Sequence, residues 1–311
     1  PTATVVNAAG TTFGYRRAFY VDSTNAVLEG FTGQGGSIGS YSIGGPGLWF
    51  GNGLVSNCII ANNIGYLGLG VYMIGGRLVD TVVRNNTCGA LNSVGGGIYM
   101  SGGVAERCTA KNNANQRGTG SGLKMTGGLF THGVIVSNVP TDNQSSGGGV
   151  AMSGGVLRNT LIAWNGASGM SSGGGANLSG GIIESCTMVT NRASTGGGVT
   201  VSGGRVTNTV VAFNAATSQV DIAGLTTNCF YSCSPDLPGG VNGNIAASPL
   251  FQNRPAGDFR LAQGSAGINL GVKQAWMPGA LDLAGERRLC GPVDMGAYES
   301  DVEVGTMITV R

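Results

Sequence analysis

Short apolar triplets recur along most of the chain, each directly after a glycine. The first and third residues of every triplet are apolar and the middle one varies, as in Leu48-Trp49-Phe50. This alternation predicts a short β-strand whose first and third side chains face inward. A glycine doublet such as Gly102-Gly103 usually follows and predicts a tight corner. The seven opening glycines are Gly47, Gly70, Gly97, Gly122, Gly149, Gly175 and Gly198.

Further along each repeat, apolar residues stand at two more fixed positions, and an asparagine closes the unit. Each closing asparagine lies 16 residues after its opening glycine, whereas 7 to 11 residues separate it from the next glycine. A constant core with one variable loop is typical of stacked repeats. The closing asparagines are Asn63, Asn86, Asn113, Asn138, Asn165, Asn191 and Asn214.

The repeat length of 23 to 27 residues and the glycine content select among repeat folds. Glycine at these positions would break the helices of an α-solenoid, and the leucine pattern of leucine-rich repeats is absent. We therefore predict an all-β fold, a parallel β-helix of about nine coils. Residues 1–233 are expected to form the β-helix with an N-terminal cap, and residues 234–311 a C-terminal capping and assembly module. Loops at residues 87–96, 114–121, 139–148 and 166–174 are expected along one edge.

Seven asparagines in register predict a structural ladder. Stacked side-chain amides can hydrogen-bond along the axis, and asparagine tolerates the left-handed backbone conformation that a bend requires. We interpret these residues as structural and not catalytic.

Composition limits the classes of partner. Glycine accounts for 59 of 311 residues, charged residues for 10%, and the net charge is +2. The chain lacks the basic patch that nucleic acid or an anionic membrane would require. It also lacks an apolar run of about 20 residues, so no membrane span is expected. Few lysines and many Gly, Ser, Thr and Asn favour an extracellular or cell-surface location, as a processed mature fragment.

Two groups of motifs resemble known proteins. Units such as GGGIYMSGGV, followed by Cys108 and Asn112-Asn113, resemble the repeats of right-handed parallel β-helix proteins of bacterial surfaces, of the polymorphic outer-membrane and autotransporter-passenger kind. The stretches SPLFQNRPAGDFRLAQGSAGINLG (residues 248–271) and DLAGERRLCGPVDMGAYES (residues 282–300) are similar to the C-terminal module of secreted β-helix proteins with a "choice-of-anchor" tail. The resemblance implies a right-handed helix, export and surface display, without fixing an activity.

Catalytic chemistry finds few candidates in the repeats. Polysaccharide lyases and hydrolases with this fold would require clustered carboxylates, and between residues 47 and 220 the acids are Asp80, Glu106, Asp142 and Glu184. We interpret three of them as exposed partners of arginines, and His132 as non-catalytic. We expect no catalytic residues, no metal and no cofactor. The denser acids after residue 257 are expected to support the closing module.

Two further features concern surfaces and thiols. Trp49, Tyr72 and Tyr99 form an outward aromatic strip, which is either a contact strip for sugar rings or cross-strand packing, and we favour packing. Cys58, Cys108 and Cys186 lie too far apart along the axis to pair and are expected to be free buried thiols. One disulfide is expected near the C-terminal end, and Cys229–Cys233 and Cys233–Cys290 are the alternatives.

These observations predict a non-enzymatic, exported structural protein: the subunit of an extracellular filament or an adhesin-like surface rod. Self-association is expected to be head to tail, with the N-terminal segment around Val5, Val6 and Phe13 as the assembly segment. A glycan or a host or neighbouring cell surface is a further expected partner. The alternative is a carbohydrate-binding or carbohydrate-cleaving β-helix.

Overall fold

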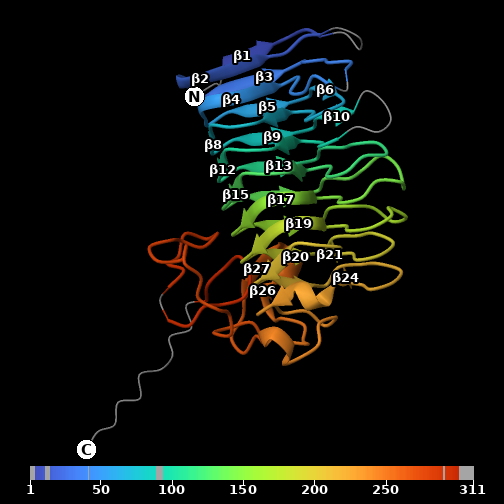
Figure 1. Ribbon diagram of the computed structural model, residues 1–311, viewed down its shortest axis with the longest axis vertical. Coiled ribbons are helices and arrows are strands. Elements are labelled where there is room, and N and C mark those ends of the chain that lie inside the picture. Colours follow the sequence, from blue (N-terminus) through green and yellow to red (C-terminus); the bar gives the residue numbers. More distant parts are fainter. Residues whose placement is uncertain (1–3, 11–14, 41, 89–93, 290, 301–311) are drawn as a thin grey trace, which may run out of the picture.

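The computed structural model of the chain is a right-handed parallel β-helix of about eight turns, which confirms the predicted fold class. Figure 1 shows the turns stacked along the longest axis, with the N-terminal turns at one end. The structure describes residues 4–10, 15–40, 42–88, 94–289 and 291–300. Among the described residues, no helix is long and apolar enough to cross a membrane.

Every full turn contributes strand segments to three columns that run along the axis, and equivalent residues of successive turns pair in parallel, as Leu48 does with Val71. The third column is a nine-stranded sheet. Its strands are β1 (Thr4–Asn7), β3 (Phe31–Gln34), β5 (Ile59–Ala61), β9 (Val82–Arg84), β13 (Thr109–Lys111), β16 (Val134–Val136), β18 (Leu161–Ala163), β20 (Thr187–Val189) and β23 (Val210–Ala212).

The first and second columns share a 14-stranded sheet, because four long strands run through the glycine corner that separates them. The long strands are β2 (Phe19–Glu29), β4 (Leu48–Ser56), β17 (Val150–Arg158) and β19 (Ala176–Glu184). Shorter first-column strands are β7 (Val71–Met73), β11 (Ile98–Met100), β14 (Leu123–Met125), β21 (Val199–Val201) and β24 (Ile222–Gly224). Second-column strands are β8 (Arg77–Val79), β12 (Val104–Glu106), β15 (Leu129–Thr131), β22 (Arg205–Thr207) and β25 (Cys229–Phe230). At the loop edge, β6 (Ile64–Gly65) pairs with β10 (Thr87–Cys88).

The inside of the β-helix is one continuous apolar core. Leu48 and Phe50 are fully buried whereas Trp49 between them is half-buried, and the other triplets keep both end residues inside, as predicted. The second and third columns add one inward residue per turn, such as Val55 and Ile60. Burying large apolar side chains in every turn is the main favourable term for such a rod.

Each full turn bends at four residues in the left-handed conformation. In the turn that begins near residue 95 these are Gly95, Gly103, Arg107 and Asn112, with φ of 69°, 77°, 51° and 54°. Glycine adopts this conformation at little cost, and Asn is the best tolerated among the other residues. The loops that follow the closing asparagines project on one side of the rod, on the right in Figure 1.

After Ile245, which still pairs in parallel with Cys233, residues 246–289 and 291–300, orange to red in Figure 1, leave the helical path. Leu237 joins the main core, and beyond it the chain forms an antiparallel hairpin of β26 (Phe251–Asn253) and β27 (Asp258–Leu261). Phe259 of this hairpin packs against Trp164 with ring centroids 5.3 Å apart. Short 3-10 turns are η1 (Thr226–Asn228), η2 (Val241–Gly243) and η3 (Arg254–Ala256). The segment therefore lies against the side of the later turns, and the domain boundary at residue 233 stays a prediction.

Candidate functional site

The seven closing asparagines form a buried hydrogen-bonded ladder along the axis. The Nδ2 of each donates to Oδ1 of the next, over 2.9 to 3.0 Å at every step. The backbone N–H of each asparagine donates to the same oxygen over 2.9 to 3.1 Å. From Asn86 onwards, Nδ2 also donates to a carbonyl of the preceding turn, so every interior amide has its hydrogen-bonding groups satisfied.

The opening glycine of each repeat faces this ladder. A Cβ atom at Gly122 would lie 2.7 Å from Nδ2 of Asn138, and a Cβ atom at any of the other six opening glycines would lie 2.5 to 2.9 Å from the Nδ2 of its own closing asparagine. None of the seven has a positive φ, so close approach and not backbone conformation requires glycine here. This contact explains why the interval between glycine and asparagine is constant.

One prediction about the ladder is wrong. The left-handed residue at this corner is the one before each asparagine, such as Ser137 or Trp164, with φ between 54° and 57° in all seven turns. The backbone N–H and the side-chain amide of a ladder asparagine must reach the same oxygen, so the asparagine itself keeps a negative φ. The preceding residue makes the bend, and its identity varies.

Asp221 ends the ladder, a role that the repeat pattern did not predict. Its Oδ1 accepts from Nδ2 of Asn214 over 2.9 Å and from the Asn214 backbone N–H over 3.0 Å. Burial raises the pKa of Asp221, and the amide hydrogen bonds from Asn214 oppose this rise. A carboxylate accepts but does not donate, so the chain of amides stops here.

The predicted aromatic strip lies on the outer face of the first column, with Trp49 beside Tyr72 and Tyr72 beside Tyr99 in the strand register. Tyr20 extends it: its ring stacks on Trp49 at 4.5 Å and 7°. Tyr72 and Tyr99 stack at 5.0 Å and 14°. Stacked rings cover each other's faces and offer mainly their edges to solvent, whereas a sugar ring packs on an open face. This geometry is that of cross-strand packing.

The four acidic residues between residues 47 and 220 form ion pairs with arginines. Arg107 binds Asp80 through two hydrogen bonds of 2.8 and 3.0 Å on the exposed surface. Nη2 of Arg158 lies 2.6 Å from Oε1 of Glu184. Glu184 was expected to be exposed but is buried, because Gln274 of the C-terminal segment covers it and donates to its Oε2. Across the described residues, no three His, Cys, Asp or Glu side chains converge as a metal site.

His132 also contacts the C-terminal segment. Its Nε2 lies 2.9 Å from the carbonyl oxygen of Leu281, to which Nδ2 of Asn159 also donates. His132, Asn159 and Asn208 occupy equivalent outward positions in their turns, and this column therefore holds the C-terminal segment through the carbonyls of Val272 and Leu281. The pattern of the repeats could not show this, because Leu281 is far away in sequence.

The predicted assembly segment is only partly described. Val5 and Val6 lie on β1, which pairs with β3, and Val5 is exposed. Phe13 lies outside the described residues.

The buried cysteines Cys58, Cys108, Cys186, Cys229 and Cys233 are free thiols. Sγ of Cys58, Cys108 and Cys186 donates to the carbonyl two residues earlier, as the hydroxyl of Thr81 does one turn away. Burial raises the pKa of Cys108 and of Cys186 to about 12.

The Cys229–Cys233 disulfide is absent from the structure. Cys229 packs in the main core and Cys233 in a separate cluster with Val210 and Met295, so the two side chains diverge. The Cys233–Cys290 alternative involves a residue outside the described range.

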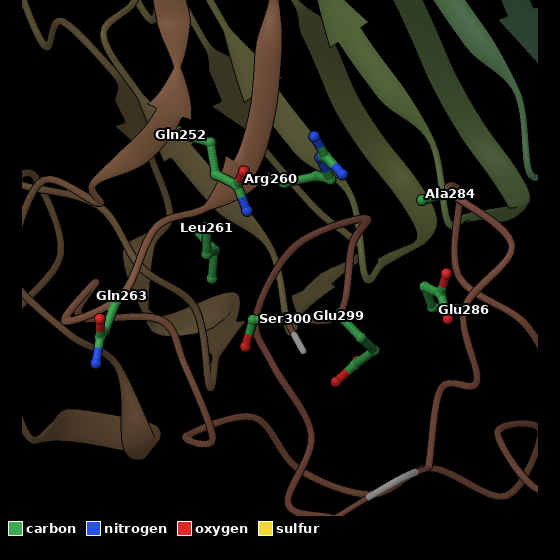
Figure 2. A pocket seen from close by; sticks show the side chains of 8 residues that line it. All are labelled: Gln252, Arg260, Leu261, Gln263, Ala284, Glu286, Glu299 and Ser300. Carbon is green, nitrogen blue, oxygen red and sulfur yellow. The ribbon is translucent and has the colours of Figure 1, made fainter. Parts of the chain in front are cut away.

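A pocket of about 330 Å³ lies within the C-terminal segment. Figure 2 shows Gln252 and Arg260 of the β26–β27 hairpin on one side and Glu299, Ser300 and Glu286 across from them. Leu261, Gln263 and Ala284 complete the lining.

Two buried carboxylates set the backbone on the far side of this pocket. Oδ1 of Asp282 accepts from the N–H groups of Ala284 and Glu286, each over 2.8 Å, and Oδ2 accepts from that of Glu299 over 2.7 Å. Oδ2 of Asp294 accepts from Ser300 N–H over 2.7 Å. Four lining residues are thus positioned by two side chains that are themselves almost fully buried.

The two charged side chains that are central to the lining are neutralised by partners. Arg260 binds Asp258 through Nε and Nη2, over 3.0 and 2.6 Å. Glu299 pairs with the fully buried Arg288, whose Nη1 lies 2.5 Å from Oε1 of Glu299. Burial raises the pKa of Glu299 to about 7, although the Arg288 guanidinium opposes the rise. The sequence did suggest a dense group of acids here, but their convergence around a pocket could not be predicted.

Comparison with known proteins leaves the family open. No family model matches the chain, and no curated protein sequence matches it. The resemblance to bacterial surface proteins and to a choice-of-anchor module therefore rests only on the residues quoted above. Among solved structures, the crystal structure of a pectate lyase, Pel9A, is similar over 81% of this chain and 72% of that chain, with a TM-score of 0.45 and 14% identity.

This comparison corrects one prediction. The similar structure belongs to an enzyme, so the expectation of a non-enzymatic protein does not stand. At this level of identity the likeness concerns the fold and transfers no activity. The strand columns of the structure itself make the chain a parallel β-helix, with an asparagine ladder inside and a pocket in the segment packed on its side.

Proposed function

We propose that this chain is an exported, rod-shaped structural protein of the cell exterior, which holds its loops along one edge at a regular spacing. The observation that carries the proposal is the uninterrupted asparagine ladder, which links seven turns through buried hydrogen bonds. A rod in which every turn binds its neighbours in the same way is stiff, and its length scales with the number of turns.

The distribution of sequence variation supports a presenting role. Length changes occur only between each closing asparagine and the next glycine, while the 16-residue interval stays constant. The loop at residues 139–148 carries exposed Thr141, Asn143 and Gln144 at its tip. Loops like this one can vary without disturbing the core.

The location is tested by immunolabelling of intact cells of the source organism. An antibody against residues 139–145 should label intact cells, and an antibody against the buried strand β18 should label only after denaturation. Labelling of the loop only after lysis would refute export.

The rod function is tested by changing the number of turns. Residues 71–97 form one complete unit, so four extra copies after Gly97 should lengthen the rod by about 19 Å at about 4.8 Å per turn. X-ray scattering measures the maximum dimension, and four copies of residues 71–84, which end within a turn, serve as the out-of-register control. A folded protein that does not lengthen, or that no longer reaches the surface, would contradict the proposal.

A further inference from the structure

The pocket in the C-terminal segment has no part in the rod, yet its walls are held more firmly than a surface hollow requires. Asp282 is 2% exposed and Asp294 is 1% exposed, and their carboxylates fix the backbone of Ala284, Glu286 and Glu299 and that of Ser300. Preorganised polar groups of this kind are typical of binding sites, because little side-chain or loop freedom remains to be lost on binding.

The charge of the pocket favours an uncharged ligand. Arg260 is neutralised by Asp258 and Glu299 by Arg288, and among the described lining residues Glu286 is the carboxylate outside these ion pairs. An anionic ligand would meet this carboxylate without an unneutralised cation to balance it. A cationic ligand would have only one exposed carboxylate, which in water provides little binding energy.

The remaining lining groups match a polyhydroxylated molecule. Gln252 and Gln263 each bring an amide that both donates and accepts, and Ser300 brings a hydroxyl that does the same. Leu261 and Ala284 supply apolar surface for the C–H groups of a ring. A pocket of about 330 Å³ is at the lower end of the range of ligand sites, which suits one or two sugar rings.

We propose that this pocket binds an uncharged saccharide unit, so that the rod carries a sugar-binding site on its side. Gln252, Gln263 and Glu286 contact the hydroxyl groups, and the Asp282 and Asp294 carboxylates act as positioning groups behind them.

The test uses the full chain and free sugars. Saturation-transfer NMR and calorimetry measure binding of D-glucose, D-galactose, D-mannose and N-acetylglucosamine, with glucuronate and spermidine as charged comparators. We expect at least one uncharged sugar to bind at one site per chain. The double variant Gln263→Ala/Glu286→Ala should weaken this binding about tenfold or more, which corresponds to one or two lost hydrogen bonds.

Matched controls separate binding from folding. Gln144→Ala changes an exposed glutamine in the loop at residues 139–148 and should leave affinity unchanged. Both variants should melt within a degree or two of the parent protein, since the altered side chains are exposed. Three results overturn the proposal: no uncharged sugar binds, only glucuronate or spermidine binds, or the double variant binds as tightly as the parent. None of these bears on the rod, whose length and location are measured separately.

Discussion

Replacement of Asn138 by alanine tests the role of the ladder directly. Oδ1 of Asn138 accepts from the backbone N–H and from Nδ2 of Asn113, both over 3.0 Å. Both donors are buried, and in the Asn138→Ala variant the backbone N–H loses its acceptor, while Nδ2 of Asn113 keeps only its hydrogen bond to the Val83 carbonyl and loses the one to Asn138. A buried donor without a hydrogen bond costs about 1 to 3 kcal/mol, so the variant should lose about 2 to 6 kcal/mol of unfolding free energy. This is a large part of the stability of an ordinary domain.

Position along the ladder adds a second, quantitative expectation. Asn63 lies at the start of the ladder, and its Oδ1 accepts from one described donor, the backbone N–H of Gly36. Asn63→Ala should therefore cost about half as much as Asn138→Ala. Equilibrium urea unfolding followed by circular dichroism gives both values, and exposed Asn143→Ala is the matched control. If Asn138→Ala lies within about 0.5 kcal/mol of the parent protein, or if Asn143→Ala costs as much, the ladder does not stabilise the rod as argued.

Three other features lead to measurable expectations. Gly122→Ala should destabilise by several kcal/mol, because its Cβ would lie 2.7 Å from Asn138 Nδ2, whereas Gly291→Ala meets no atom within 4 Å and should be nearly neutral in the same urea assay. Burial raises the pKa of Glu299 to about 7 from 4.5, so the stability that its protonated form contributes is complete below pH 4.5 and is lost as the pH rises through 7. Between pH 4.5 and 8 the unfolding free energy should therefore fall more in the parent protein than in the Glu299→Gln variant. Parallel profiles of unfolding free energy against pH would contradict this. Among the described thiols, iodoacetamide at pH 8 should label half-buried Cys88 first and should reach Cys108 and Cys186, with pKa values of about 12, only on unfolding, as mass spectrometry can show.

The repeat turns were predictable because the sequence provides several residues for each equivalent position of the turn. Alternation in the triplets gave the inward and outward faces, and the structure buries Leu48 and Phe50 as expected. The error about the left-handed corner has a local cause. Seven different turns place Asn, Ser, Trp, Thr or Phe at the residue before the ladder, so no residue preference marked that position. The left-handed position is identified only by the structure, in which the backbone N–H and Nδ2 of each ladder asparagine donate to the same Oδ1.

Features that occur once could not be predicted in this way. Asp221 resembles a ladder asparagine in its role but follows Asn214 by seven residues, so the repeat interval does not reveal it. The contacts of His132 and Glu184 with residues 274–281 join parts of the chain that are far apart in sequence. Without homologous sequences, nothing in the single sequence links such positions.

The same contrast explains where a specific ligand site would form in this protein. In a stacked repeat, each turn presents nearly the same groups as the turn before it, and stacking covers the faces of its aromatic side chains, as with Tyr72 and Tyr99. A pocket requires unlike groups that converge, and a regular column does not supply them. The non-repeating segment does, because Asp282 and Asp294 fold it back on itself while Trp164 and His132 anchor it to the rod. The turns thus provide the rigid support, and the segment packed on their side provides the chemical diversity that recognition needs.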